Sequence, residues 1–105
     1  MNSFFKKSLL ATTLCTFFIV HAQETYILNY EDVDIKKVTQ DIANFSKKTI
    51  ILDPRVKGKV TIFSNSSLSS DEVWDVYLRT IQVNGFSALN DENFVRIVPE
   101  NEATR

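Results

Sequence analysis

The sequence predicts an α+β domain with the element order strand, helix, strand, strand, helix, strand, strand. Two kinds of pattern indicate this order. Residues 49–64 contain two runs rich in β-branched side chains, separated by Asp-Pro and Lys-Gly breaks that are typical of a turn. On either side, at residues 34–47 and 69–83, apolar side chains recur at helical spacing. Further short strands complete one small domain, which we expect over residues 23–99.

Residues 1–22 have the pattern of a secretory signal peptide. Lys6 and Lys7 form a positive start, residues 9–20 are mostly apolar, and Ala22 is a small residue at the expected cleavage position. A retained transmembrane anchor is the alternative, but it needs roughly 20 predominantly apolar residues. This run is shorter and contains three threonines. We therefore expect cleavage after Ala22 and export of the rest of the chain.

Removal of this segment would change which functions the chain can perform. Cys15 and His21 are its only cysteine and histidine, so the mature chain would have neither. Disulfides, thiol chemistry, a Ser-His-Asp triad and the common zinc sites each need one of them. Without Lys6 and Lys7, the mature chain would have 10 Lys and Arg instead of 12, and still 13 Asp and Glu. Its net charge would be 10 − 13 = −3. An acidic exported domain is a poor candidate for nucleic-acid binding.

The first strand is predicted at residues 26–30, where the side chains alternate. Tyr26, Leu28 and Tyr30 are expected to face the core, and Ile27 and Asn29 to face away. Residues 31–34 then predict a turn, with Asp34 as the N-cap of the first helix. We interpret the acidic residues of this turn as helix capping rather than as a cation site, because the spacing and glycine of a calcium loop are missing.

The remaining elements follow from similar signals. Residues 50–52 and 59–63 are predicted to form a hairpin. Ser69 and Glu72 match a capping box at the start of the second helix, in which Trp74 is expected to be a core aromatic. Gly85 suits the left-handed position after that helix. Two last strands, at residues 86–89 and 94–98, are predicted to pair across residues 90–93, and residues 100–105 to begin a linker.

The residues themselves resemble the first periplasmic domain of type II secretion system secretins. The matching stretches are Tyr26-Ile-Leu-Asn-Tyr, Val33-Asp-Ile, Ile51-Leu-Asp-Pro-Arg-Val-Lys-Gly-Lys-Val-Thr, Leu68-Ser-Ser-Asp-Glu-Val, Gly85-Phe and Val95-Arg-Ile-Val-Pro. The Asp-Pro-Arg-Val-Lys-Gly run is the most specific of them. The others are shared more loosely with type IV pilus secretins and with signalling domains of some TonB-dependent receptors.

This resemblance implies two helices flanked by two small sheets, at the periplasmic mouth of an outer-membrane ring. It also implies a partner, the inner-membrane clamp component of the machine, and a position where folded exoproteins enter. Neither a cofactor nor an enzymatic activity is implied. A secretin continues through further periplasmic domains into an oligomeric gate, so we expect this chain to be a fragment of one. The alternative is a truncated or stand-alone copy, which would be periplasmic.

For the partner contact we expect strand addition, in which an exposed strand edge provides main-chain hydrogen bonds and outward side chains provide specificity. The candidate contacts are Ile27, Asn29, Glu31 and Asp32. For Ile27 the alternative is packing under a second sheet. Arg55 and Lys57 are candidates for contact with a neighbouring ring subunit or the partner, and the alternative is a solvated turn.

Two other functions compete with this interpretation. A receptor signalling domain would bind a membrane-spanning anti-sigma regulator instead of a clamp protein. An enzyme would have to use carboxylates such as Asp53, Asp71 or Glu72. A turn aspartate and a helix N-terminal pair account for these residues, so we expect no enzyme.

Overall fold

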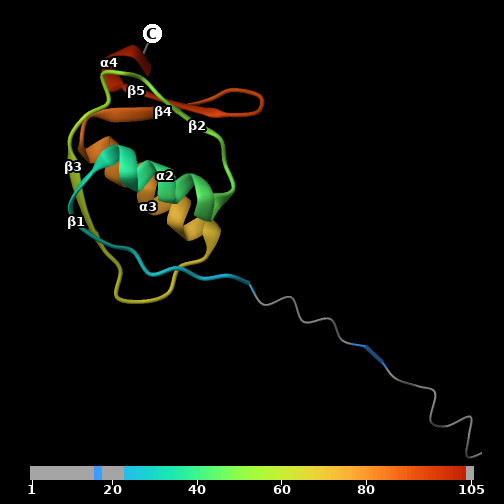
Figure 1. The fold of residues 1–105 in the computed structure, drawn as a ribbon. Helices are drawn as coiled ribbons and strands as arrows, with labels where there is room; N and C mark the ends of the chain where they lie inside the picture. Colours follow the sequence, from blue (N-terminus) through green and yellow to red (C-terminus); the bar gives the residue numbers. More distant parts are fainter. Residues whose placement is uncertain (1–15, 18–22, 104–105) are drawn as a thin grey trace, which may run out of the picture.

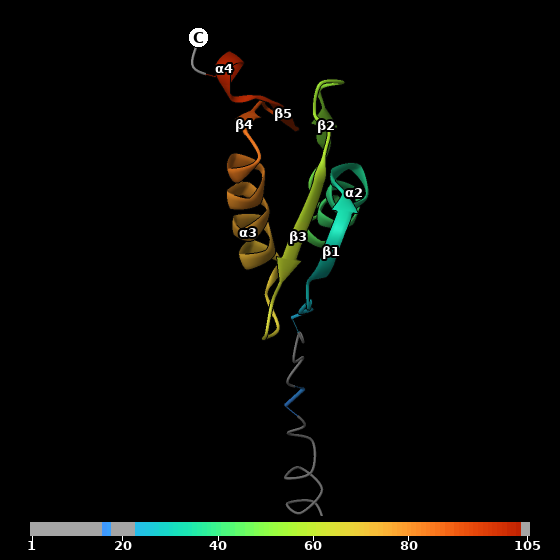
Figure 2. The same cartoon turned by 90° about the vertical axis from the view of Figure 1, so that its left-hand side faces the viewer.

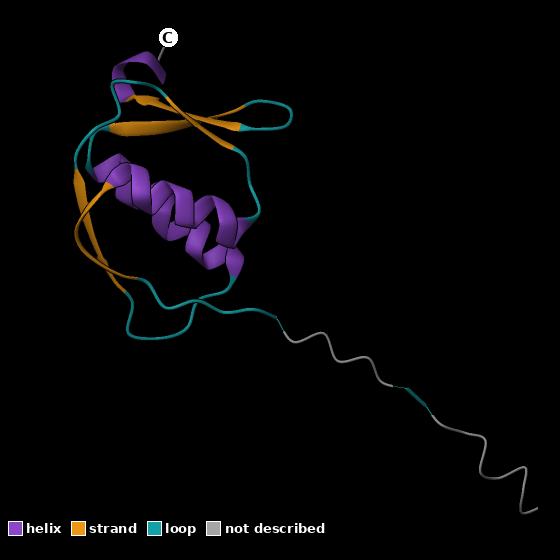
Figure 3. Ribbon diagram, in the orientation of Figure 1, coloured by secondary structure: helices purple, strands orange, loops and turns teal. Residues whose placement is uncertain are grey.

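Two helices lie side by side between two small sheets in the computed structural model, which describes residues 16–17 and 23–103 (Figures 1 and 3). The predicted signal peptide, with Cys15, lies almost entirely outside the described residues. The described part has the predicted fold class and element order. Its elements are β1 (Asn29–Asp34), α2 (Ile35–Ser46), β2 (Ile50–Leu52), β3 (Lys59–Phe63), α3 (Ser70–Val83), β4 (Phe86–Asn90), β5 (Val95–Pro99) and α4 (Glu100–Ala103).

The two long helices begin at the predicted caps. The Asp34 side chain accepts a hydrogen bond from the Lys36 backbone N–H at 2.8 Å, which starts α2. Ser69 and Glu72 form the predicted capping box at the start of α3: each side chain accepts from the other residue's backbone N–H, at 3.3 and 3.0 Å. Both helix starts are therefore set by local sequence.

The core lies between the helices and is sealed by both sheets. Its largest fully buried side chains are Leu28, Ile35, Val38, Ile42, Val56, Val73, Tyr77, Ile81 and Ile97. The Tyr77 hydroxyl lies 2.9 Å from the buried Thr39 hydroxyl, and burial raises the pKa of Tyr77. Trp74 packs against this core as predicted but is only partly buried, with the Lys48 ammonium 5.1 Å from its ring centroid.

The predicted central hairpin is wrong. β2 pairs in parallel with β5, while β3 pairs antiparallel with β1, so the two strands belong to different sheets. The connection between them, residues 53–58, is fixed at both ends and in the middle. The Asp53 N–H donates to Ile97, Val56 is fully buried, and the Gly58 carbonyl accepts from the Ile35 N–H. These contacts carry the chain from one sheet to the other.

The first strand is displaced from its predicted position. Residues 31–34, predicted as a turn, continue the strand, and Tyr26 makes only an isolated bridge with Leu68. The register shifts between Tyr30 and Val33, where Asp32 has φ 53°. A bulge of this kind keeps pairing on both sides of an irregular residue, which alternation alone does not predict.

The C-terminal half follows the prediction closely. Gly85 has φ 88° after α3, and β4 and β5 form the antiparallel hairpin. One helical turn, α4, occupies residues that the sequence predicts as linker, and its first N–H, from Glu100, donates to Gly85 at 3.0 Å. Within the described residues, no helix is both long and apolar enough to cross a membrane.

Candidate partner-binding surface

The two-stranded sheet of β1 and β3 has one face on the core and one face in solvent (Figure 2). Tyr30 pairs with Ile62 on the core side, and Asn29 pairs with Phe63 on the outer side. Partners in an antiparallel pair share a face, so Phe63 stands beside Asn29. The Phe63 side chain is 65% exposed, and that of Ile27 is 67% exposed. Exposed side chains along β1 and at the end of β3 form what we call the docking face: Ile27, Asn29, Glu31, Asp32 and Phe63.

The structure therefore decides two points about the candidate residues of the first strand. Ile27 is not packed under a second sheet, because two thirds of its surface is exposed. All four candidates, from Ile27 to Asp32, are exposed and lie on one strand or its N-terminal extension. Sequence reasoning missed Phe63. Its position was implied by the alternation of β3, in which Val60 and Ile62 face the core and the odd positions face solvent.

The outer edge of β1 is suited to accept another strand. In the described part of the chain β1 pairs only with β3. Leu28 directs its backbone toward Ser64: its N–H donates to the Ser64 hydroxyl, and its carbonyl accepts from the Ser64 N–H, both at 2.8 Å. Strand alternation then turns the N–H and C=O groups of Asn29, the first residue of β1, to the outer edge. The exposed Ile27 side chain lies two residues before it, on the extension that leads into the strand.

The bulge at Asp32 limits how far this edge extends. The Asp32 N–H donates to the Thr61 hydroxyl at 3.0 Å, and its carboxylate lies 3.8 Å from the Lys59 ammonium. Both charged side chains of that pair are largely exposed, so it contributes little to stability. A bulge also interrupts the regular edge and discourages unspecific strand pairing. The regular part of the ladder before the bulge is consequently Asn29 and Tyr30, and residues 27–28 form its extension outside β1.

A polar cluster on the core side ties β1 to α2. The Tyr30 hydroxyl donates to Asp41 at 2.8 Å, and the Lys37 ammonium bonds the other oxygen of Asp41 at 2.9 Å. Burial, followed by this hydrogen bond to a carboxylate, raises the pKa of Tyr30 well above its usual value. The hydroxyl therefore stays neutral and acts as a fixed donor. This cluster holds the strand that carries the docking face.

Arg55 and Lys57 lie apart from the docking face, on the connection between β2 and β3. Arg55 makes a bidentate ion pair with Asp53, with both nitrogen to oxygen distances 2.9 Å. This pair lowers the pKa of Asp53 to about 2, from 3.8. The connection meets the Asp34 end of β1, roughly 20 Å from Ile27 at the rise of a strand. Lys57 is exposed, so the two residues form a second, separate candidate surface.

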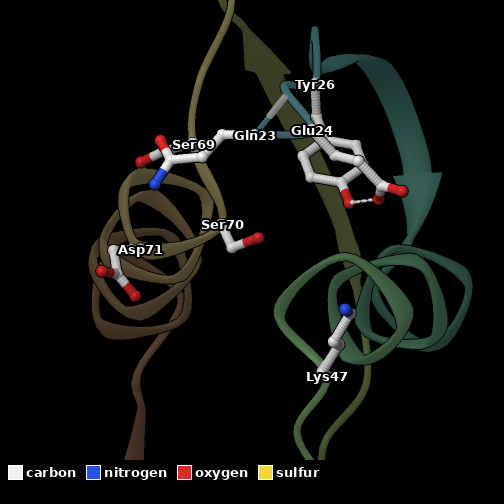
Figure 4. Close-up of a pocket in the computed structure, with 7 residues that line it drawn as sticks. All are labelled: Gln23, Glu24, Tyr26, Lys47, Ser69, Ser70 and Asp71. Atoms are coloured by element: carbon white, nitrogen blue, oxygen red, sulfur yellow. Dashed lines mark hydrogen bonds between the residues drawn. The ribbon is translucent and has the colours of Figure 1, made fainter. Parts of the chain in front are cut away.

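A polar hollow lies elsewhere, between the end of α2 and the start of α3, with a volume of about 430 Å³ (Figure 4). Polar side chains dominate its lining: Gln23, Glu24, Tyr26, Lys47, Ser69, Ser70 and Asp71. Among the described residues no group of three or more His, Cys, Asp or Glu side chains is placed to hold a metal ion.

The comparisons with known proteins point to the secretins of type II secretion systems. The family model described as "GspD-like, N0 domain" matches residues 28–97. Secretin XcpQ of Pseudomonas aeruginosa is 35% identical over 78 residues, which is 74% of this chain but 12% of XcpQ. This chain thus spans about an eighth of the length of that curated relative.

Solved structures agree with this assignment. The N0 domain of the type II secretin from enterotoxigenic Escherichia coli is 26% identical, with a TM-score of 0.69 over 75% of this chain and 99% of that one. PulD in the Klebsiella pneumoniae outer-membrane complex with PulS and the PulC HR domain is 27% identical. Its TM-score is 0.60, over 67% of this chain and 12% of PulD. The chain belongs to the GspD-like N0 domain family of type II secretins.

Proposed function

We propose that this domain is the docking module of a type II secretin and binds the inner-membrane clamp component through the docking face. The observation that carries the proposal is the exposure of Ile27 and Phe63, at 67% and 65%, beside the free edge of β1. The relative PulD is found in complex with the PulC HR domain, which supports a small protein partner for the same kind of domain. The role is protein transport by docking, without catalysis.

Each part of the docking face has its own task in this proposal. The outward backbone groups of Asn29 hydrogen bond to an added strand. The side chains of Ile27 and Phe63 are removed from water by the partner. Burial of side chains of this size is worth about 1.5–3 kcal/mol each. Glu31 and Asp32 lie at the polar rim, where charge affects the association rate more than the affinity.

A titration followed by NMR tests the proposal. The labelled domain, residues 23–103 or longer, is titrated with the periplasmic part of the cognate clamp protein. Amide shifts should cluster on residues 26–34 and 61–64 and saturate. The double variant Ile27→Ser, Phe63→Ser should weaken binding roughly tenfold to a hundredfold or more, since about 1.4 kcal/mol corresponds to a factor of ten.

The matched control is Ile51→Ser, because Ile51 is also an exposed aliphatic residue, 45% exposed, but belongs to the other sheet. This variant should bind normally. Equal losses in the control and the double variant would point to a general stability effect. No shifts at all with a folded clamp domain would refute docking through this face.

The remaining parts of the proposal concern the assembled machine. The domain lies in the periplasm at the mouth of an outer-membrane ring, lines the entrance for exoproteins, and contacts neighbouring subunits through Arg55 and Lys57. The separation of these residues from the docking face supports two distinct contacts. Charge reversal of Lys57 to Glu in a full-length secretin should weaken ring contacts without changing clamp binding. Arg55 is less suited to this test, since its replacement also breaks the pair with Asp53.

A further inference from the structure

Contacts attach the chain to the domain from Tyr26 onward, and residues 23–25 before it are exposed to solvent. Tyr26 and Leu68 exchange two backbone hydrogen bonds of 2.8 Å, and the Tyr26 ring stacks on Phe45 with centroids 4.4 Å apart. Gln23, Glu24 and Thr25 precede this anchor and are exposed. Gln23 is therefore only three positions outside a firm attachment, yet accessible to enzymes and solvent.

Gln23 lies at the rim of the polar hollow, in front of the start of α3 (Figure 4). Gln23 and Ser69 line the same hollow. Across the described part of the chain, no hydrogen bond or ion pair holds the Gln23 side chain, unlike Glu24, which accepts from the Tyr26 hydroxyl at 2.7 Å. The Gln23 amide is thus free to rotate toward its own backbone nitrogen.

We propose that Gln23 is an N-terminal modification site that closes to pyroglutamate after the signal peptide is removed. Cleavage after Ala22 turns the Gln23 nitrogen into a free α-amine. That amine attacks the side-chain Cδ carbonyl carbon, a new N–C bond forms, the bond from Cδ to the amide nitrogen breaks, and ammonia leaves. One proton moves from the attacking amine to the departing nitrogen, so the reaction consumes no oxidant, reductant or water.

The hollow beside Gln23 is polar and, at about 430 Å³, leaves room for the ring to close. Gln23 lines it together with Glu24 and the start of α3. The lactam is neutral, so closure removes the positive charge of the terminal amine. The inference rests on the predicted cleavage position and is independent of clamp binding.

Mass spectrometry of the exported chain tests it. The full chain, with its leader, is expressed in a bacterial host, recovered from the periplasm and digested. The N-terminal peptide should begin at residue 23 and be lighter than the plain peptide by one molecule of ammonia. It should resist Edman degradation and become sensitive after treatment with pyroglutamyl aminopeptidase.

The matched control is Gln23→Asn, whose side chain keeps the amide but is one methylene too short to close an unstrained lactam. Its N-terminal peptide should keep the free amine. A wild-type peptide that begins at Gln23 and retains its full mass after prolonged incubation would overturn the proposal. A mature terminus at any other residue would overturn it as well. In that case the proposal would fail because the signal peptide is cleaved at a different position.

Discussion

At the scale of single residues, the buried hydroxyl pair of Tyr77 and Thr39 links the two helices. Tyr77→Phe should destabilise the domain by about 1–3 kcal/mol, because it leaves the buried Thr39 oxygen without its partner. Adding Thr39→Val should recover part of this loss, since no polar group then remains unpaired. Urea unfolding of the single and double variants measures both effects. A double variant less stable than the sum of the singles would contradict this explanation.

Asp53 gives a residue-scale prediction about pH. Its pKa is lowered from 3.8 to about 2 in the folded state, first by the Arg55 side chain and then by the Arg55 backbone N–H. A lowered folded pKa means that the ionised form stabilises the fold above pH 3.8 and that this contribution is lost as pH falls toward 2. Asp53→Asn should therefore be less stable than wild type near neutral pH, and the gap should close across this window.

Unfolding midpoints measured from neutral to acid pH check this prediction. Asp75→Asn is the control, because Asp75 is an exposed aspartate on α3. A gap that closes equally in both variants would point to a general effect of acid rather than to the Arg55 pair. A constant gap between Asp53→Asn and wild type down to pH 2 would show that the Arg55 pair does not act through ionisation.

The residue scale also shows what alternation can and cannot reveal. The inward positions Leu28, Val60 and Ile62 were readable, because apolar and polar residues alternate around them. Alternation also implies that Phe63 is outward, but an aromatic residue is normally assigned to the core. The bulge at Asp32 left no signal, since an exposed acidic stretch is equally typical of a turn.

At the scale of elements, the capping box at the start of α3 is the clearest local signal. Ser69→Ala removes the hydroxyl that accepts from the Glu72 N–H and should cost about 1 kcal/mol of stability. Ser69→Asp should retain most of it, because aspartate is an equally good N-cap. Thermal or urea unfolding distinguishes them. Equal losses in both variants would mean that the cap does not determine where α3 begins.

The strands themselves were easier to predict than the strands with which they pair. The two central runs are strands, as predicted, but β2 is parallel to β5 and β3 is antiparallel to β1. A composition rich in β-branched residues identifies a strand but does not determine which strand pairs with it. Long-range contacts decide which strands pair. Examples are the hydrogen bond from the Asp53 N–H to the Ile97 carbonyl and the burial of Val56. A turn-like sequence between two strands is therefore consistent with a crossing between sheets.

At the scale of the whole molecule, the two sheets should differ in local stability. A two-stranded sheet is marginal by itself, whereas β5 is paired on both sides and Ile97 is fully buried. Native-state hydrogen exchange should show lower opening free energies for the amides of β1 and β3 than for those of β5. Bound clamp protein should raise protection in β1 specifically. Uniform protection in the free domain would contradict this ranking.

The connection at residues 53–58 makes the domain indivisible. A nick there would separate a fragment holding β1, α2 and β2 from one holding β3, α3, β4, β5 and α4. The first fragment lacks the partners of both its strands, and the second lacks an edge strand of each sheet. Each half thus supplies the strands that the other half lacks. The two halves meet in both sheets and where α2 packs against α3. We expect neither half to persist as a folded remnant, although the two together retain every strand pair of the intact chain.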